Sequence, residues 1–308
     1  MITYFQAIII GLLQGVTELF PISSLGHSVI IANLFGWNNL LKQETAKESG
    51  FLSFLVVLHV ATAIALIIFY RREWVRIIKG FFRSLRTKQL ADDSDAKLAW
   101  LLIAATIPAG LIGLIFEHAL RTQFAKPIYA IIFITLNGIL LIKGDKVVKA
   151  AQHQRPRQRK QAAANVDEQM MSKTTKMVSD QLTIGKAILI GIAQIGALFA
   201  GISRSGITML AGLRSGLSHE DAARFSFLLA TPIILAAGVY KLHDFVGSNG
   251  SGIRGQVLVG GLVAGVAAYF SVKYLDKYFQ TRSLRPFGIY CVILGVSMFL
   301  LGIFRGHF

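Results

Sequence analysis

Runs of apolar residues separated by short polar segments follow one another along almost the whole sequence. A helix needs about 20 predominantly apolar residues to cross the hydrocarbon core of a bilayer, with roughly 17 to 25 the usual range. Six runs come close to this length and contain no Asp, Glu, Lys or Arg. They predict six transmembrane helices, over residues 51–70, 98–116, 127–142, 225–240, 255–272 and 287–304.

Two further apolar regions, residues 4–35 and 184–217, do not fit a simple span. Small, polar and charged residues interrupt each of them near its middle. Irregular backbone at membrane depth is tolerated only where protein or a water-filled cavity covers it. Both regions are therefore expected to form re-entrant helix-loop-helix hairpins, which enter the membrane and return to the same side.

The two interrupted regions are related in sequence. Residues 11–26 and 191–206 align at a constant offset of 180, and five of sixteen positions are identical. Each hairpin precedes three predicted spans, an odd number, so the second half must be inverted relative to the first. The predicted fold class is an all-α polytopic membrane protein, with six transmembrane helices and two re-entrant hairpins in an inverted-topology repeat. Such repeats place the functional site near the bilayer midplane, where the two halves meet.

This pattern predicts one integral membrane domain over residues 1–308. The first repeat takes about residues 1–142 and the second about residues 183–308. A basic linker, about 143–182, joins them and is expected to be cytoplasmic.

Composition supports the membrane assignment. Hydrophobic residues make up 54% of the chain and charged residues 16%, whereas soluble domains carry about 25% charged residues. These values exclude an ordinary soluble enzyme, and a single cysteine excludes a disulfide scaffold. The net charge of +16 would suggest nucleic acid in a soluble protein. Here Lys and Arg fall mostly between the apolar runs, so the expected partner is the lipid bilayer and no nucleic acid.

The basic residues also predict topology. Residues 71–97 contain eight Lys or Arg, 143–186 contain ten and 273–285 contain four, while each remaining connection contains two. With six spans and two hairpins, the three basic segments all fall on one side. The positive-inside rule makes that side the cytoplasm, so both termini are expected outside.

The first hairpin contains groups suited to catalysis. A charged Glu18 at the bilayer centre is unfavourable by roughly 2.5–3.5 kcal/mol, so function is its default interpretation. Gln14 lies four residues earlier, on the same helix face. Ser23 and Ser24 follow in the break, and His27 is expected to lean back toward Ser24. A carboxylate, a hydroxyl and an imidazole can activate a hydroxyl nucleophile. The structural alternative is that Ser23 caps a helix and His27 bonds a carbonyl.

The second hairpin has the composition of a phosphate-binding loop. Gly201 and Gly206 flank Ser203, Arg204 and Ser205 at the break. Glycine lets the backbone approach a ligand closely, and the N-terminus of the following helix favours an anion. The Arg204 guanidinium matches phosphate oxygens with two parallel donors. These residues predict a phosphate-binding site, which is not a Walker loop because the lysine and its spacing are absent.

Brought together at the midplane, the two hairpins would combine Glu18, Ser24, His27 and Arg204. This set suggests phosphoryl transfer on an amphiphilic substrate. A structural alternative is that Arg204 only pairs with Glu18. A functional alternative is a transporter or lipid scramblase, which would need Arg204 but not Ser24 beside His27. His59 could line the site, but we interpret it as a core histidine.

At these residues the sequence resembles the undecaprenyl-diphosphate phosphatase family, the BacA/UppP type linked to bacitracin resistance. The resembling motifs are Gln14…Glu18 leading into Pro21-Ile-Ser-Ser-Leu-Gly-His27, and Ala200-Gly-Ile-Ser-Arg-Ser-Gly206. The resemblance implies a bacterial inner-membrane enzyme whose site opens to the outside. It would remove the terminal phosphate of a polyprenyl diphosphate, so that the lipid carrier is recycled for cell-wall synthesis.

The resemblance also assigns roles. It implies that Glu18, Ser24, His27 and Arg204 are catalytic, and leaves open whether Ser24 or His27 takes the phosphoryl group. Substrate-binding residues are expected at Gln14, Ser23, Gly201, Ser203, Ser205 and Gly206. A divalent metal, Mg²⁺ or Ca²⁺, is expected to bind Glu18, mainly together with substrate.

Four positions, Gln14 among them, depart from the family pattern near the site. Leu25 replaces a threonine, Ala200 a proline, and Leu55 an acidic residue found in many members. With Gln14 as the neutral member of its pair, these changes remove negative charge and leave one carboxylate for a metal. A paralogue with low activity is therefore an alternative to a fully active enzyme. The sequence also allows a homo-oligomer.

Overall fold

The computed structural model describes residues 2–37, 40, 50–88, 93–124, 126–153, 178–246 and 252–305. Every regular element in these residues is helical, as predicted. The first half contains α1 (Tyr4–Thr17), α2 (Ser24–Leu34), α4 (Gly50–Phe69), α5 (Arg71–Thr87), α6 (Ser94–Phe124) and α7 (Pro127–His153). The second half contains α9 (Ile184–Ile195), the 3₁₀ turn η1 (Gly196–Leu198), α10 (Arg204–Arg214), α11 (His219–Val246), α12 (Arg254–Tyr278) and α13 (Arg285–Phe304).

The expected spans are helices in the structure. Among the described residues, five helices are long and apolar enough to cross a membrane, within α6, α7, α11, α12 and α13. There are six if α4 and α5, which pass the same test together and meet at an angle of 87°, are counted as one span. These helices confirm an all-α polytopic membrane protein. The basic linker lies largely outside the described residues, although its first part, up to His153, continues α7.

The two interrupted regions form hairpins of short helices, as predicted. Ser23 caps α2 by accepting a hydrogen bond from the Gly26 backbone N–H at 3.2 Å. Ser203 caps α10 by accepting from the Gly206 N–H, also at 3.2 Å. The same local device therefore begins the second helix of both hairpins.

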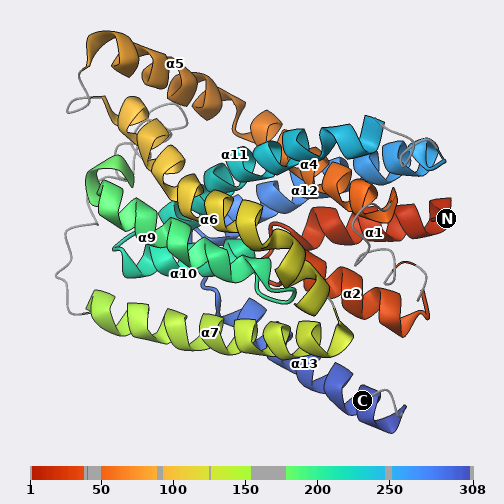
Figure 1. Ribbon diagram of the computed structural model, residues 1–308. Helices are drawn as coiled ribbons and strands as arrows, with labels where there is room; N and C mark the ends of the chain where they lie inside the picture. Colours follow the sequence, from red (N-terminus) through yellow and green to blue (C-terminus); the bar gives the residue numbers. More distant parts are fainter. Residues whose placement is uncertain are drawn as a thin grey trace.

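The hairpins enter the helical body from opposite ends (Figure 1). Helices α1 and α2 lie toward the end that holds both chain termini, whereas α9 and α10 extend toward the opposite end. Helix α1 packs along α12, and its repeat counterpart α9 packs along α6. This arrangement is the one that an inverted repeat requires, and it places both hairpin tips at the centre of the protein.

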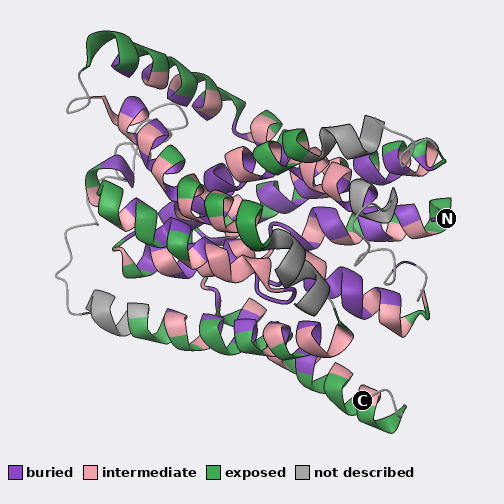
Figure 2. Ribbon diagram, in the orientation of Figure 1, coloured by how far each residue is buried: buried purple, intermediate pink, exposed green. Residues whose placement is uncertain are grey.

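Burial follows the same arrangement (Figure 2). Buried residues concentrate where the hairpin tips meet, while the outward faces of the long helices are exposed. Many exposed side chains are large and apolar, among them Leu262, Phe270 and Ile293. Exposed apolar surface of this extent fits contact with lipid.

Most of the basic segment 71–97 forms α5 and the start of α6. Helix α5 is amphipathic and buries Ile77 and Gly80 against α6. Its exposed residues combine arginines with Val75, Ile78 and Phe82. A basic amphipathic helix of this kind is suited to lie in the membrane interface.

The repeat predicts which glycines the fold cannot replace. A Cβ at Gly191 would clash with the Ala105 carbonyl of α6, just as one at Gly11 would lie 2.5 Å from the Gly260 carbonyl oxygen of α12. We expect Gly191→Ala to lower the free energy of unfolding by roughly 1–3 kcal/mol, the usual effect of overpacking. Gly185→Ala is the matched control, because no atom lies within 4 Å of a Cβ there. Equal thermal unfolding of the two variants in detergent would contradict this prediction.

Candidate functional site

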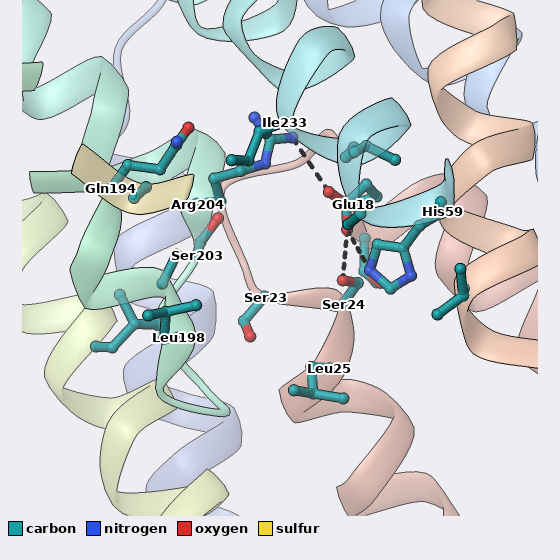
Figure 3. A pocket seen from close by; sticks show the side chains of 18 residues that line it. Glu18, Ser23, Ser24, Leu25, His59, Gln194, Leu198, Ser203, Arg204 and Ile233 are labelled. Carbon is teal, nitrogen blue, oxygen red and sulfur yellow. Dashed lines mark hydrogen bonds and ion pairs between the residues drawn. The ribbon is translucent and has the colours of Figure 1, made fainter. Parts of the chain in front are cut away.

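A cavity of about 310 Å³ lies where the two hairpin breaks meet (Figure 3). Helices α4, α6 and α11 complete its walls, and most of its lining is apolar. The polar side chains that line it are Thr17, Glu18, Ser23, Ser24, His59, Gln194, Ser203 and Arg204. An apolar cavity with a few converging polar groups is typical of a site for an amphiphilic ligand.

Glu18 is the centre of this polar group. Its Oε1 accepts a hydrogen bond from Arg204 Nη2 at 3.1 Å. Its Oε2 accepts from Ser24 Oγ at 2.6 Å and from Gln14 Nε2 at 3.2 Å. His59 Nε2 lies 3.4 Å from the same oxygen. The carboxylate is thus buried with donors on both oxygens, which is what a charge in this environment requires.

Local sequence explains why Ser24 faces Glu18. Helix α1 ends at Thr17, and the chain turns through the next residues to the cap at Ser23, whose φ is 73°. Ser24 is the first residue of α2 and its hydroxyl points back to the end of α1. The predicted shared face of Gln14 and Glu18 is confirmed by their hydrogen bond.

Hydrogen bonds connect the two breaks. The Gly201 N–H donates to Ser23 Oγ at 3.2 Å. Asn137 of α7 donates from Nδ2 to the Pro21 carbonyl at 3.1 Å and accepts from the Ser203 N–H at 3.0 Å. One side chain therefore holds both loops, and the prediction that the breaks meet is confirmed.

The other glycines and serines of the second motif lie behind the cavity. Gly201 has φ 115°, and a Cβ there would lie 2.6 Å from the Ala130 carbonyl oxygen. Ser205 Oγ donates to the Phe20 carbonyl at 3.2 Å. Gly206 supplies the N–H that binds the Ser203 cap. Their contacts support the loop. Ser23 and Ser203 line the cavity, whereas Gln14, Gly201, Ser205 and Gly206 do not.

Arg204 is the first residue of α10 and extends across to the first hairpin. Besides Glu18, its guanidinium contacts the Ser226 carbonyl, with Nη1 at 3.3 Å. Its Nε is buried and has no hydrogen-bond partner among the described residues. Arg204 does pair with Glu18, as in the structural alternative given above. Its Nε is still available to donate a hydrogen bond to a ligand.

His27 does not lean toward Ser24, so that expectation is wrong. Its Nδ1 lies 2.7 Å from the Ser23 carbonyl oxygen, and its Nε2 lies 2.9 Å from the Tyr290 hydroxyl of α13. Because Ser23 is four residues earlier, its carbonyl is within reach inside the helix, and α13 binds the other ring nitrogen. Both nitrogens are thus engaged away from the cavity.

His59 was interpreted from the sequence as a core histidine, but the structure places it in the site. Its Nδ1 lies 2.8 Å from the Leu55 carbonyl oxygen, which leaves Nε2 facing Glu18. It lines the cavity and is the imidazole near Ser24. Its position depends on how α4 packs against the hairpins, which no local motif signals.

Gln194 is a second residue that the sequence analysis did not place in the site. It lines the cavity, and both of its polar atoms are buried without a hydrogen-bond partner among the described residues. The repeat held a signal, because Gln194 aligns with Gln14 at the offset of 180.

The described residues contain no group of three or more His, Cys, Asp or Glu side chains placed to hold a metal. Glu18 is the carboxylate in the cavity lining. Since Mg²⁺ and Ca²⁺ prefer several oxygen ligands, these residues fit a single contact to such an ion rather than a preformed cage.

A sequence profile described as bacitracin resistance protein BacA matches residues 7–297. The undecaprenyl-diphosphatase of Mycolicibacterium paratuberculosis is 50% identical over 296 residues, covering 96% of this chain and 95% of that protein. Undecaprenyl-diphosphatase 2 of Frankia alni is 48% identical, covering 96% of both chains. Undecaprenyl-diphosphatase 2 of Chromobacterium violaceum is 42% identical, covering 94% of this chain and 96% of that protein.

The Glu18–Arg204 pair should show measurable coupling. In Glu18→Gln the Arg204 charge loses its buried partner, and we expect the free energy of unfolding to fall by on the order of 1–3 kcal/mol. The double variant Glu18→Gln/Arg204→Gln should recover part of this loss, because no uncompensated charge remains. Thermal unfolding of the wild type, both single variants and the double variant measures the coupling. Strictly additive effects would show that the pair contributes nothing.

Proposed function

The chain belongs to the bacitracin resistance protein BacA family, and from this premise we propose that it hydrolyses undecaprenyl diphosphate to undecaprenyl phosphate and inorganic phosphate. The observation that carries the proposal is the cavity in which Ser24, Glu18 and Arg204 are joined by hydrogen bonds. A nucleophile, a base and a phosphate-binding cation are the groups that phosphoryl transfer needs.

The polar and the apolar walls of the cavity would bind different parts of the substrate. The diphosphate would lie against Arg204, whose partnerless Nε can donate to a phosphate oxygen. The first isoprenoid units would lie against apolar residues such as Leu198, Ile202 and Ile233. An apolar wall also excludes water, which strengthens the attraction between the guanidinium and the phosphates.

In the first chemical step, Ser24 Oγ attacks the terminal phosphorus while the bridging P–O bond breaks. The hydroxyl proton passes to Glu18, whose Oε2 already accepts it at 2.6 Å. The leaving group is the lipid monophosphate, and the phosphoryl group remains on Ser24 as an ester. Arg204 stabilises the charge that develops on the phosphate oxygens.

In the second step, water hydrolyses the Ser24 phosphoester and releases inorganic phosphate. His59 Nε2, adjacent to Glu18, is placed to take the proton of that water, and Glu18 returns the proton it received in the first step to the departing Ser24 Oγ. We assign His27 a supporting role, since its ring nitrogens bind Ser23 and Tyr290. In the described part of the chain, no contact specifically favours a transporter or scramblase, which would not need Ser24 hydrogen-bonded to a carboxylate.

The activity prediction is that Ser24→Ala lowers kcat for phosphate release from undecaprenyl diphosphate by at least about 100-fold, because the nucleophile is lost. Ser28→Ala, on the same helix and outside the cavity lining, is the matched control and should retain activity. Purified wild-type protein that releases no phosphate from the lipid would refute the proposed function. Full turnover by Ser24→Ala would refute the nucleophile.

We propose further that Mg²⁺ or Ca²⁺ binds mainly together with the diphosphate, through Glu18. When bound, such an ion would neutralise part of the diphosphate charge. The protein would supply one carboxylate, and phosphate oxygens and water would supply the remaining ligands.

Calorimetry tests this proposal. We expect Mg²⁺ to bind at least about tenfold more tightly when a non-hydrolysable lipid diphosphonate is present than in its absence. Removal of the metal by a chelator should abolish turnover, and added Mg²⁺ should restore it. Gln14→Glu should raise the affinity of the substrate-free protein. Tight binding to the free protein that Glu18→Gln leaves unchanged would overturn the proposal.

The protein is a multi-pass membrane protein, and we propose the bacterial inner membrane as its location. The basic helix α5 supports a cytoplasmic assignment for the end of the molecule at which it lies, opposite both termini (Figure 1). The first hairpin would then open its side of the site to the outside, where the released carrier is recycled for cell-wall synthesis.

Topology can be measured with two reporters. A reporter active only outside the cytoplasm should work when fused after Phe308, and one active only in the cytoplasm should fail there. The opposite pattern should hold for insertions near residue 90, just after α5. A C-terminal fusion that is active only in the cytoplasm would reverse the proposed orientation.

A further inference from the structure

Gln194 is a buried polar residue that the mechanism above does not use. Its side chain is 3% exposed and lines the cavity. Neither Nε2 nor Oε1 has a hydrogen-bond partner in the part of the chain that the structure describes. Buried polar groups in native proteins are nearly always paired, so this amide requires an explanation.

The repeat explains why the amide is unpaired. In the first hairpin, Gln14 Nε2 donates to Glu18 Oε2, four residues later. At the offset of 180, the counterpart of Gln14 is Gln194 and the counterpart of Glu18 is Leu198. The second copy thus retains the amide and replaces its acceptor by an apolar side chain. The amide is left facing the cavity.

A second partnerless donor lies in the same cavity. Arg204 Nε is buried without a hydrogen-bond partner, while the two other guanidinium nitrogens bind Glu18 and the Ser226 carbonyl. In Figure 3 the Gln194 amide lies on the Arg204 side of the site, and His59 lies on the far side of Glu18. A neutral donor beside a cationic donor is suited to an anionic oxygen.

The position of Ser24 decides which phosphate this is. The terminal phosphorus must lie against Ser24 Oγ, on the side of Glu18 and His59. In Figure 3 Gln194 lies on the other side of Arg204 from Glu18, Ser24 and His59, and the cavity lining also contains the apolar residues Ala109, Ala197 and Leu198. The part of an amphiphilic diphosphate next to apolar protein is the phosphate that carries the lipid.

We propose that Gln194 Nε2 and Arg204 Nε bind the lipid-side phosphate of the polyprenyl diphosphate, the phosphate that is not transferred. This subsite rests on the proposed function, since it presupposes a diphosphate substrate. Gln194 Oε1 accepts from water in the cavity. The subsite holds the leaving group, so it recognises both the substrate and the lipid monophosphate product.

Kinetics separate this role from others. Gln194→Met keeps the length of the side chain and removes both hydrogen-bonding atoms. We expect KM for undecaprenyl diphosphate and the inhibition constant of undecaprenyl phosphate each to rise by about tenfold or more, because a hydrogen bond to an anion is lost. Inhibition by inorganic phosphate should stay unchanged, because that ion occupies the terminal position beside Ser24.

Two further variants make the test specific. Thr231→Val is the matched control, because Thr231 Oγ1 is also buried with no hydrogen-bond partner among the described residues but lies outside the cavity lining. It should leave all three constants unchanged. Gln194→Glu keeps the shape and one acceptor, and should weaken binding of undecaprenyl phosphate at least as much as Gln194→Met, because a carboxylate repels the phosphate.

The outcomes distinguish the subsite from the proposed function. Phosphate release by the wild type tests the function, whereas a thermal-shift titration with undecaprenyl phosphate tests the subsite without turnover. The subsite is refuted if both Gln194 variants bind undecaprenyl phosphate as the wild type does. It is also refuted if the inhibition constant of inorganic phosphate rises in parallel with KM, since Gln194 would then serve the terminal phosphate.

Discussion

The ion pair between Glu18 and Arg204 is the contact on which the site depends. A lone carboxylate or guanidinium at membrane depth is unfavourable, so each of these residues requires the other. Glu18 is the C-cap of the first helix of one hairpin, and Arg204 begins the second helix of the other. Their 3.1 Å contact therefore requires the two hairpin tips to meet, and the cavity is the space around that meeting point.

The sequence was sufficient wherever a feature depends on local rules. Helix periodicity placed Gln14 and Glu18 on one face, and capping chemistry located the start of α2 at Ser23. The offset of 180 predicted that the breaks are equivalent, and the pairing of Arg204 with Glu18 was one of the alternatives that the sequence left open. These inferences need only a few consecutive residues or one clear repeat, so they required no knowledge of how the long helices pack.

The histidines show where local reasoning fails. His27 is close to Ser24 in sequence, but the Ser23 carbonyl and the Tyr290 hydroxyl bind its ring instead. His59 is remote in sequence, yet the packing of α4 brings its Nε2 to 3.4 Å from Glu18. In both cases the deciding partner lies on another helix or on the backbone. No residue spacing encodes such a contact, so proximity in sequence was a poor guide to the base.

The repeat also explains how a symmetric scaffold produces an asymmetric site. Ser24 and Arg204 occupy equivalent positions at the offset of 180, each directly after a capping serine. The first copy places a hydroxyl there and the second a guanidinium, so one backbone geometry provides the nucleophile and the phosphate-binding group. Leu198 likewise occupies the position equivalent to Glu18, so the second copy has an apolar side chain where the first has a carboxylate. Two identical copies would set like charges against each other, whereas divergence at a few equivalent positions makes the halves complementary to a diphosphate.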